Sequence, residues 1–313
     1  MCPPFDFYDV GENEMSFYGS IKKNARSALK GRRGAGVLAT LFVVGAGVLF
    51  AVAELASLRA AAPPPSYYWQ SGQAGQDYFL RVFFGHSPGE LVVTSMALAA
   101  YLGLMAPLLL GWKRWHYVLI QGERPSFREL FYFFGSRRNY LRAVWHNIQL
   151  AVRCLWWGVV FLSLPAGLLS TCVRILAIEG IARQTRMAAS VGVLIALGLL
   201  VMMAILYAIY IGKYALGAYL LCESEEISVT RALSDSARYT SGYRGVKFLF
   251  TLSFAGWYLL SALTFFTALV FVLPYHAAGE TVFARYLIEL SRSKGEQPAL
   301  EQVTQEFGNA VPG

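Results

Sequence analysis

The sequence alternates apolar runs of about 20 residues with segments that carry most of its lysine and arginine. An α-helix rises about 1.5 Å per residue, so a run of that length crosses a hydrocarbon core about 30 Å thick. Of the 313 residues, 56% are hydrophobic and 15% are charged, against roughly 25% charged in soluble domains. The pattern predicts an all-α, polytopic transmembrane helical bundle.

Five apolar segments stand out, at 35–58, 91–110, 148–169, 188–211 and 246–273. The last can be one long helix that ends at Pro274. It can also be a hairpin that turns near Thr264–Thr267, with arms at 246–263 and 266–287. The second arm contains ionisable groups, which must face other helices or water.

The connecting segments differ in their content of lysine and arginine, which sets the orientation of membrane helices. Residues 1–34 carry six, 112–146 carry seven and 212–247 carry five, whereas 58–90 carry two and 174–187 carry three. We therefore expect a multi-pass protein of the plasma membrane with the N-terminus and the basic connections in the cytoplasm. The loop 59–90 then lies outside.

The three basic segments resemble one another and predict an internal repeat. Leu29, Leu130 and Leu233 stand at matching places, 101 and 103 residues apart. Each unit would be a basic amphipathic interfacial helix followed by a span out and a span back. This reading favours six spans in three helical hairpins, with both termini in the cytoplasm.

Two of the predicted interfacial helices cover about 126–138 and 228–240, with Ser126 and Ser228 as their N-caps. In the first, Phe127, Leu130, Phe131 and Phe134 are spaced to share one helical face. Such helices lie in the headgroup plane, or they pack on the cytoplasmic ends of the spans. The residues expected to bind anionic headgroups are Arg32, Arg33, Arg128, Arg137, Arg138 and Arg244.

The C-terminal half also resembles a known family. The residues that carry the likeness are Lys213, Tyr219, Ser228, Ala232-Leu233, Ser253-Phe254-x-Gly256-Trp257, Leu263-Thr264, Leu273-Pro274-Tyr275 and Phe283. This pattern is similar to bacterial integral membrane proteins of the domain-of-unknown-function 975 family, and the segment ARSALKGRRGAGV resembles the usual opening of that family. The chain departs from it in a longer loop 59–90 and in Phe265-Phe266-Thr267, where a Gly-rich turn is expected. The resemblance implies a membrane fold and no particular activity.

Few ionisable residues fall within the predicted spans. Glu54 either reaches the outer interface or faces the bundle. His276 and Glu280 are four residues apart and share a helical face, so they could form a proton-sensitive site. The alternative is that the chain bends at Pro274 and leaves both in cytoplasmic water. Pro165 is the other candidate kink.

No motif of metal, nucleophilic or phosphate chemistry is visible, because HExxH, GxSxG and P-loop patterns are all missing from the sequence. We expect a non-enzymatic protein with no cofactor and no metal. The acidic segment 222–226 is most simply a solvated turn.

The predicted organisation is a cytoplasmic segment 1–33, one transmembrane domain 34–290 and a polar tail 291–313. The favoured function is a membrane scaffold or an accessory subunit. A transporter of a small solute or a lipid, with a proton-sensitive site at the last span, is the alternative. The expected partners are membrane lipids, another protein or further copies of the chain, and no nucleic acid.

Overall fold

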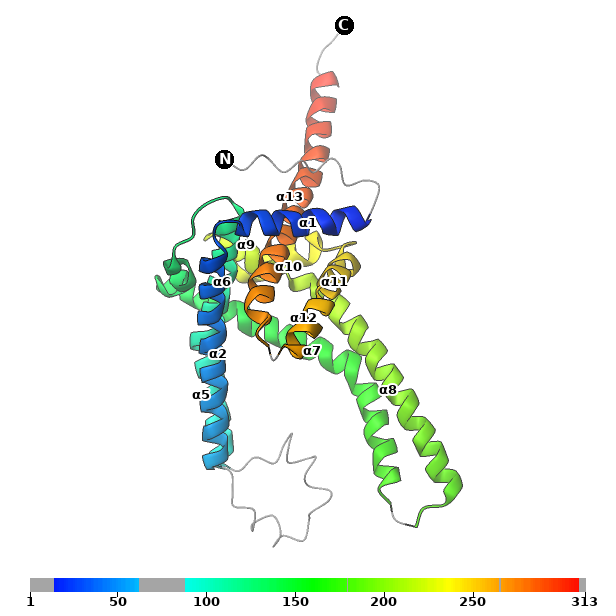
Figure 1. Ribbon diagram of the computed structural model, residues 1–313. Helices are drawn as coiled ribbons and strands as arrows, with labels where there is room; N and C mark the ends of the chain where they lie inside the picture. The colour runs from blue at the N-terminus through cyan, green and yellow to red at the C-terminus, as the bar shows by residue number, and fades with distance from the viewer. Residues whose placement is uncertain (1–13, 62–87, 179, 265, 310–313) are drawn as a thin grey trace.

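The computed structural model describes residues 14–61, 88–178, 180–264 and 266–309, and these residues form helices with no strand among them (Figure 1). The predicted outer loop 59–90 falls mostly outside the described residues. The α-helices are α1 Glu14–Leu29, α2 Arg33–Ala61, α5 Pro88–Ala100, α6 Ala106–Ile120, α7 Arg137–Leu176, α8 Arg183–Ile211, α9 Gly217–Glu223, α10 Val229–Tyr239, α11 Arg244–Leu252, α12 Ala255–Leu263 and α13 Leu269–Asn309. The shorter elements are the π-helix η2 Tyr101–Met105 and the 3-10 helices η3 Phe127–Phe134 and η4 Gly212–Tyr214.

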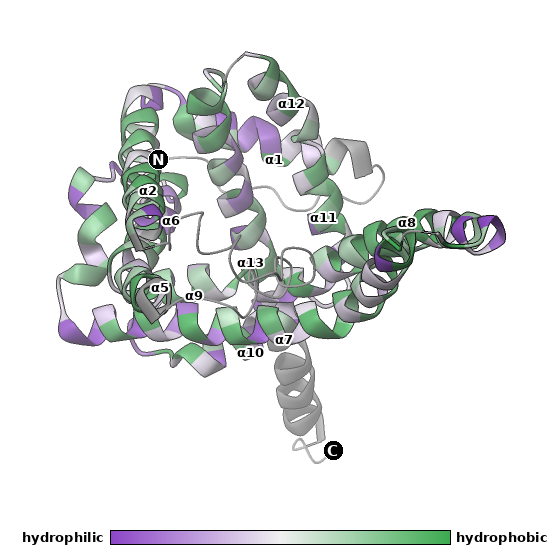
Figure 2. Cartoon of the chain, turned by 90° about the horizontal axis from the view of Figure 1, so that it is seen from below, coloured by the Kyte–Doolittle hydropathy of each residue, from purple (hydrophilic) through white to green (hydrophobic). Residues whose placement is uncertain are grey.

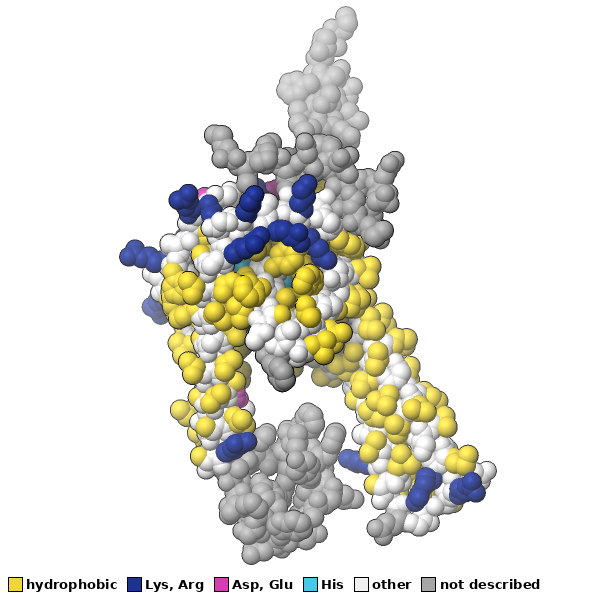
Figure 3. Space-filling model, viewed as in Figure 1, with side chains coloured by type: hydrophobic (Ala, Val, Ile, Leu, Met, Phe, Trp, Pro, Cys, Tyr) yellow, Lys and Arg dark blue, Asp and Glu magenta, His cyan; other side chains and the backbone are white. Residues whose placement is uncertain are grey.

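Two long helical pairs project from one end of the molecule. The first pair is α2 with the continuous run α5–η2–α6, and the second pair is α7 with α8 (Figure 1). Figure 3 shows the two pairs as separate columns that are covered with hydrophobic side chains along most of their length. Lys and Arg side chains gather where the pairs join and again at their far ends, which is the charge distribution of a membrane-crossing surface.

A third pair, formed by α11–α12 and the start of α13, lies between the two long pairs (Figure 2). The chain reverses between Leu263 and Leu269, and Phe266 takes a positive φ of 65° in this turn. In Figure 1 the third pair ends well short of the far ends of the long pairs. Its first arm is also interrupted at Ser253 and Phe254, between α11 and α12.

Five helical segments are long and apolar enough to cross a membrane, by length and composition. They are Arg33–Ser57, Val92–Ile120, Arg137–Leu176, Arg183–Glu223 and Arg244–Leu263. These segments contain the predicted spans 148–169, 188–211 and 246–263. They also contain all but the last residue of 35–58 and all but the first residue of 91–110. The sixth predicted span, 266–287, is not among them, and six spans in three membrane hairpins remain a prediction. The predicted tail does not form a separate helix, because α13 continues through Ser291 to Asn309.

The buried core lies where the three pairs join, in a part of the molecule that we call the head. The head consists of α1, α6, η3, α9, α10, α11–α12 and the middle of α13. Its largest fully buried side chains include Trp115, Phe133, Phe250, Phe254 and Phe283. Their burial provides the main favourable term in assembling the head.

The landmark leucines of the predicted repeat all belong to this core, since Leu130 and Leu233 are fully buried and Leu29 is nearly so. Two of the basic segments end in the same kind of glycine corner. Gly31 follows α1 and Gly242 follows α10, with φ of 78° and 82°, and the next helix begins two residues later. Glycine suits these corners because it has no Cβ to clash at positive φ.

One of the two predicted N-caps of the interfacial segments is present in the structure. Ser228 caps α10, because its hydroxyl accepts from the Arg231 amide at 3.3 Å, as predicted. Ser126 precedes η3 but makes no such bond. Because η3 is a 3-10 helix with three residues per turn, Leu130 and Phe133 point into the head together. Three of the residues predicted to share a face with Leu130 stay exposed, namely Phe127, Phe131 and Phe134.

Gly111 sets the distance between α6 and η3. A Cβ added there would lie 2.6 Å from the carbonyl carbon of Leu130. The obstacle is backbone, which cannot move aside as a flexible side chain can. The approach also places the Leu110 carbonyl 3.9 Å from the Cys222 thiol, which donates to it from α9.

We expect Gly111→Ala to destabilise the protein by about 1–3 kcal/mol, because the added methyl group overpacks a backbone contact. The measurement is thermal unfolding of the full chain in detergent. Gly198→Ala on α8 is the matched control, since nothing lies within 4 Å of a Cβ at that position. Equal melting temperatures for the two variants would contradict the close approach of α6 to η3.

Candidate functional site

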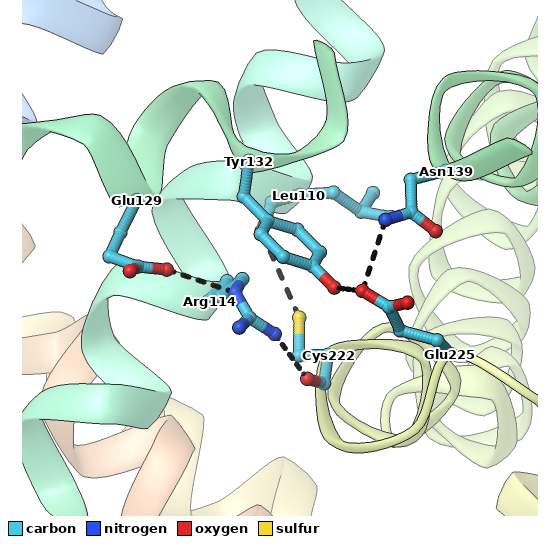
Figure 4. A network of polar contacts seen from close by, with 7 residues as sticks. All are labelled: Leu110, Arg114, Glu129, Tyr132, Asn139, Cys222 and Glu225. Atoms are coloured by element: carbon cyan, nitrogen blue, oxygen red, sulfur yellow. Dashed lines mark hydrogen bonds and ion pairs between the residues drawn. The ribbon is translucent and has the colours of Figure 1, made fainter. Parts of the chain in front are cut away.

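The acidic segment between α9 and α10 is the centre of a polar network, which we call the acidic-turn network (Figure 4). It connects residues 222–227 to α6, η3, α7 and α13. The partners lie 69 to 108 positions away along the chain. The network is therefore a tertiary contact between distant parts of the chain.

Arg114 on α6 forms one side of the network. Its Nε donates to the Glu129 carboxylate at 3.0 Å, and its Nη1 donates to the Cys222 carbonyl at 2.6 Å. The guanidinium also lies 3.5 Å from the centre of the Tyr132 ring. A planar guanidinium can bind a carboxylate, a carbonyl and an aromatic face at once, whereas the ammonium of lysine lacks this geometry.

Glu225 and Arg142 form the other side. Glu225 accepts from the Tyr132 hydroxyl and from the Asn139 side-chain amide, the latter at 3.3 Å. Arg142 on α7 donates from Nη2 to the carbonyls of Ser224 and Ile227, at 2.7 and 2.9 Å. These bonds hold both ends of the turn against the start of α7.

A bidentate ion pair connects the turn to α13. The two terminal nitrogens of Arg292 lie 2.7 and 2.8 Å from the two carboxylate oxygens of Glu223. Parallel bonds of this kind fix orientation as well as distance. Glu223, Glu225 and Glu226 are exposed, as expected of a solvated turn. What the sequence did not predict is that the carboxylates and carbonyls of this turn also bind arginines that lie far away in the sequence.

His276 and Glu280 lie half-buried on α13 inside the head, and each has a partner on the facing helices. The Tyr258 hydroxyl lies 2.7 Å from His276 Nδ1, and the Lys247 ammonium lies 4.0 Å from the Glu280 carboxylate. The expectation that a bend at Pro274 leaves both residues in water was wrong. The two side chains bind different partners, so a direct His276–Glu280 pair is not what the geometry provides.

Glu280 also lines a small cavity of about 90 Å³. Two lysines, Lys113 of α6 and Lys247 of α11, line the same cavity, together with Tyr219 of α9. Sequence reasoning missed both lysines, because each lies close to the end of an apolar run and looks like an ordinary flanking charge. One carboxylate facing two ammonium groups leaves an excess of positive charge there.

The predicted headgroup-binding arginines divide into two groups. Arg32 donates to the Glu123 carbonyl, and Arg244 is half-buried with its guanidinium 5.8 Å from the Tyr210 ring centre. The other four are exposed, namely Arg33, Arg128, Arg137 and Arg138. Contact with lipid remains a prediction for all six.

The remaining predicted residues are Glu54, Pro165 and Pro274, and each lies within a helix. Glu54 is half-buried in the C-terminal half of α2. Pro165 lies inside α7, and α7 continues through it. Pro274 lies inside α13, and a Cβ added to Gly36 of α2 would lie 3.7 Å from it, so Pro274 belongs to the contact between these helices.

These observations define an all-helical protein with five segments suited to crossing a membrane and a buried head at their basic ends. The family model described as Protein of unknown function (DUF975) matches residues 15–291, and the chain belongs to that family. The match confirms the resemblance noted in the sequence. No curated protein and no solved structure matches the chain.

Hydrogen bonding in the acidic-turn network changes the acidity of its members. The bonds from Tyr132 and Asn139 hold the pKa of the Glu225 carboxyl below its ordinary value of 4.5. Burial, and then the bond to Glu225, raise the pKa of the Tyr132 phenol. A carboxyl whose pKa is lowered by folding stabilises the folded state above pH 4.5 and loses that effect as the pH falls through the folded value.

We therefore expect Glu225→Gln to lower the melting temperature at pH 7, because a charge-assisted hydrogen bond becomes a neutral one. The difference from the wild type should shrink as the pH falls below 4.5, where Glu225 itself becomes protonated. Thermal unfolding across this pH range is the measurement. Glu226→Gln removes the same charge from the adjacent exposed residue and should change stability less. A difference that stays constant with pH would argue against the lowered pKa.

Proposed function

We propose that this chain is a non-catalytic scaffold or accessory subunit of a membrane, with its basic end in the cytoplasm. The observation that carries the proposal is the divergence of the two long pairs from one fixed head (Figure 3). The acidic-turn network and the aromatic core hold the starts of the pairs in a set arrangement. An assembly that spreads two pairs of apolar helices in this way is suited to receiving other transmembrane helices.

The surfaces of the long pairs support this proposal. Leu49 on α2 is 73% exposed, and Leu155 on α7 and Leu194 on α8 are each 70% exposed. Gly45 on α2 and Gly198 on α8 have nothing within 4 Å of an added Cβ. Small residues at open positions allow membrane helices to approach closely. The expected occupant is the transmembrane helix of a partner or of a second copy.

The proposal predicts protein contacts along the long pairs. A photoreactive amino acid placed at Leu155 or Leu194 in the full chain should give protein–protein adducts in native membranes, detected by gel shift and mass spectrometry. Phe271 on α13 is a matched control, because it is also 70% exposed but lies outside both long pairs. If both positions on α7 and α8 give lipid adducts alone, the scaffold proposal is wrong.

A specific observation supports a second candidate, a transporter with a proton-sensitive site. The cavity between Lys113, Lys247 and Glu280 places ionisable groups inside the head, where polar groups in membrane proteins often serve transport. Against it, the head around this cavity is filled by Phe250, Phe254 and Phe283. The cavity of about 90 Å³ suits water or a small ion rather than a larger solute.

The transporter candidate predicts a pH-dependent proton flux that requires Glu280. Purified wild-type protein in liposomes loaded with a pH-sensitive dye should dissipate a pH gradient, and Glu280→Gln should abolish this flux. Glu226→Gln, on the exposed acidic segment, is the control for the loss of one carboxylate. An identical rate in the Glu280→Gln variant would exclude a proton site at this position.

A further inference from the structure

A groove lies between the α1–α2 corner and the third helical pair, which we call the corner groove. Its volume is about 360 Å³, and α1, α2, α12 and α13 all contribute to its walls. This size is at the lower end of the range for ligand sites. A single turn of a helix about 10 Å across already fills a volume of this order. A small or slender molecule fits the groove better than a protein helix does.

One end of the groove carries two arginines. Arg26 comes from the last turn of α1 and Arg33 from the first residue of α2, and both side chains are exposed. Among the described residues, no carboxylate forms an ion pair with either guanidinium, which would require a distance of 4.0 Å or less. Arg32, between them, differs because it donates to the Glu123 carbonyl. Arg26 and Arg33 are thus available to an anionic group.

The other end of the groove is apolar. Its walls there are Val37 of α2, Trp257 of α12 and Phe271 and Val272 of α13. Trp257 is 48% exposed and Phe271 is 70% exposed. A flexible hydrocarbon chain would cover these surfaces.

Polarity changes in the same direction along both walls. On α2, Val37 follows Arg33 by four residues, or about 6 Å, in the direction that leads into the apolar part of the first pair. On α13, Phe271 lies near the turn of the third pair, and Tyr275 lies one helical turn closer to the arginines. The Tyr275 ring centre is 5.8 Å from the Arg26 guanidinium. The ligand that fits has one anionic end level with α1 and one apolar end within the membrane.

We propose that the corner groove binds one anionic phospholipid from the bilayer. Its phosphate lies between Arg26 and Arg33, and one acyl chain runs past Val37 to Trp257 and Phe271. Arginine suits a phosphate because its planar donors bind two oxygens together. The basic level of the molecule, where Figure 3 shows Lys and Arg gathered, is the level at which headgroups lie.

The test is lipid binding to the full chain in detergent, measured by native mass spectrometry. The probes are phosphatidylglycerol and phosphatidylcholine with identical acyl chains. The first molecule of phosphatidylglycerol should bind at least about tenfold more tightly than the first molecule of phosphatidylcholine. The reason is that two guanidinium groups contact the net negative charge of phosphatidylglycerol. In the double variant Arg26→Gln/Arg33→Gln this preference should disappear.

The control is Lys23→Gln/Lys30→Gln, which removes two positive charges from exposed positions of the same corner that do not line the groove. It should keep the preference for phosphatidylglycerol. Equal losses in the two double variants would show general surface attraction and overturn the proposal. Displacement of the lipid by millimolar inorganic phosphate would also overturn it, because the site would then bind a free anion.

A second measurement keeps the proposal testable if the arginine variants fail to fold. Phosphatidylglycerol with brominated acyl chains should quench part of the tryptophan fluorescence of the protein. In the variant Trp257→Phe, the component of the fluorescence that is quenched at the lowest lipid concentration should be missing. Unchanged quenching in this variant would show that the acyl chain does not lie against α12, and the proposal would fail.

Discussion

The contact on which the rest of the structure depends is the binding of the acidic turn by arginines from three helices. The three residues are Arg114 of α6, Arg142 of α7 and Arg292 of α13. Arg114 and Arg142 donate to backbone carbonyls of the turn, and Arg292 binds the Glu223 carboxylate. Each long pair contributes one of these helices, and the third pair contributes α13. Removing Arg114 would take its hydrogen bond from the carbonyl of the buried Cys222, which costs more than the bond itself contributes. The arrangement of the three pairs is thus fixed at one place, at their basic ends.

Fixing the pairs at one end explains why burial is so uneven. The head packs aromatic and aliphatic side chains with nearly no exposure, whereas the long pairs are covered with exposed leucines and valines. In water such surfaces would cause aggregation, but in lipid they carry no such cost. The third pair differs from the long ones, because it is short, interrupted at Ser253 and Phe254, and bears ionisable groups that face the head.

The sequence predicts those features of the fold that depend on local composition. The apolar runs give the long helices, and Ser228 marks the start of α10 because a cap is a property of neighbouring residues. Contacts across about 70 to 110 positions leave no such trace. Arg142 and Arg292 look like ordinary flanking charges, and their partners in the acidic turn are found only when the chain is folded. The corner groove is similar, since Arg33 and Phe271 line it together although more than 200 positions separate them in the sequence.

The length of α13 has a mechanical consequence. From Leu269 to Asn309 it is a single helix of 41 residues, which corresponds to about 60 Å. It begins beside the corner groove, passes the Lys247–Glu280 pair, binds the acidic turn through Arg292 and then extends beyond α1 (Figure 1). A continuous helix transmits rotation and tilt along its axis with little loss. One rigid rod thus connects the wall of the corner groove, the Lys247–Glu280 pair and the acidic turn, so the position of any one of them along α13 constrains the other two.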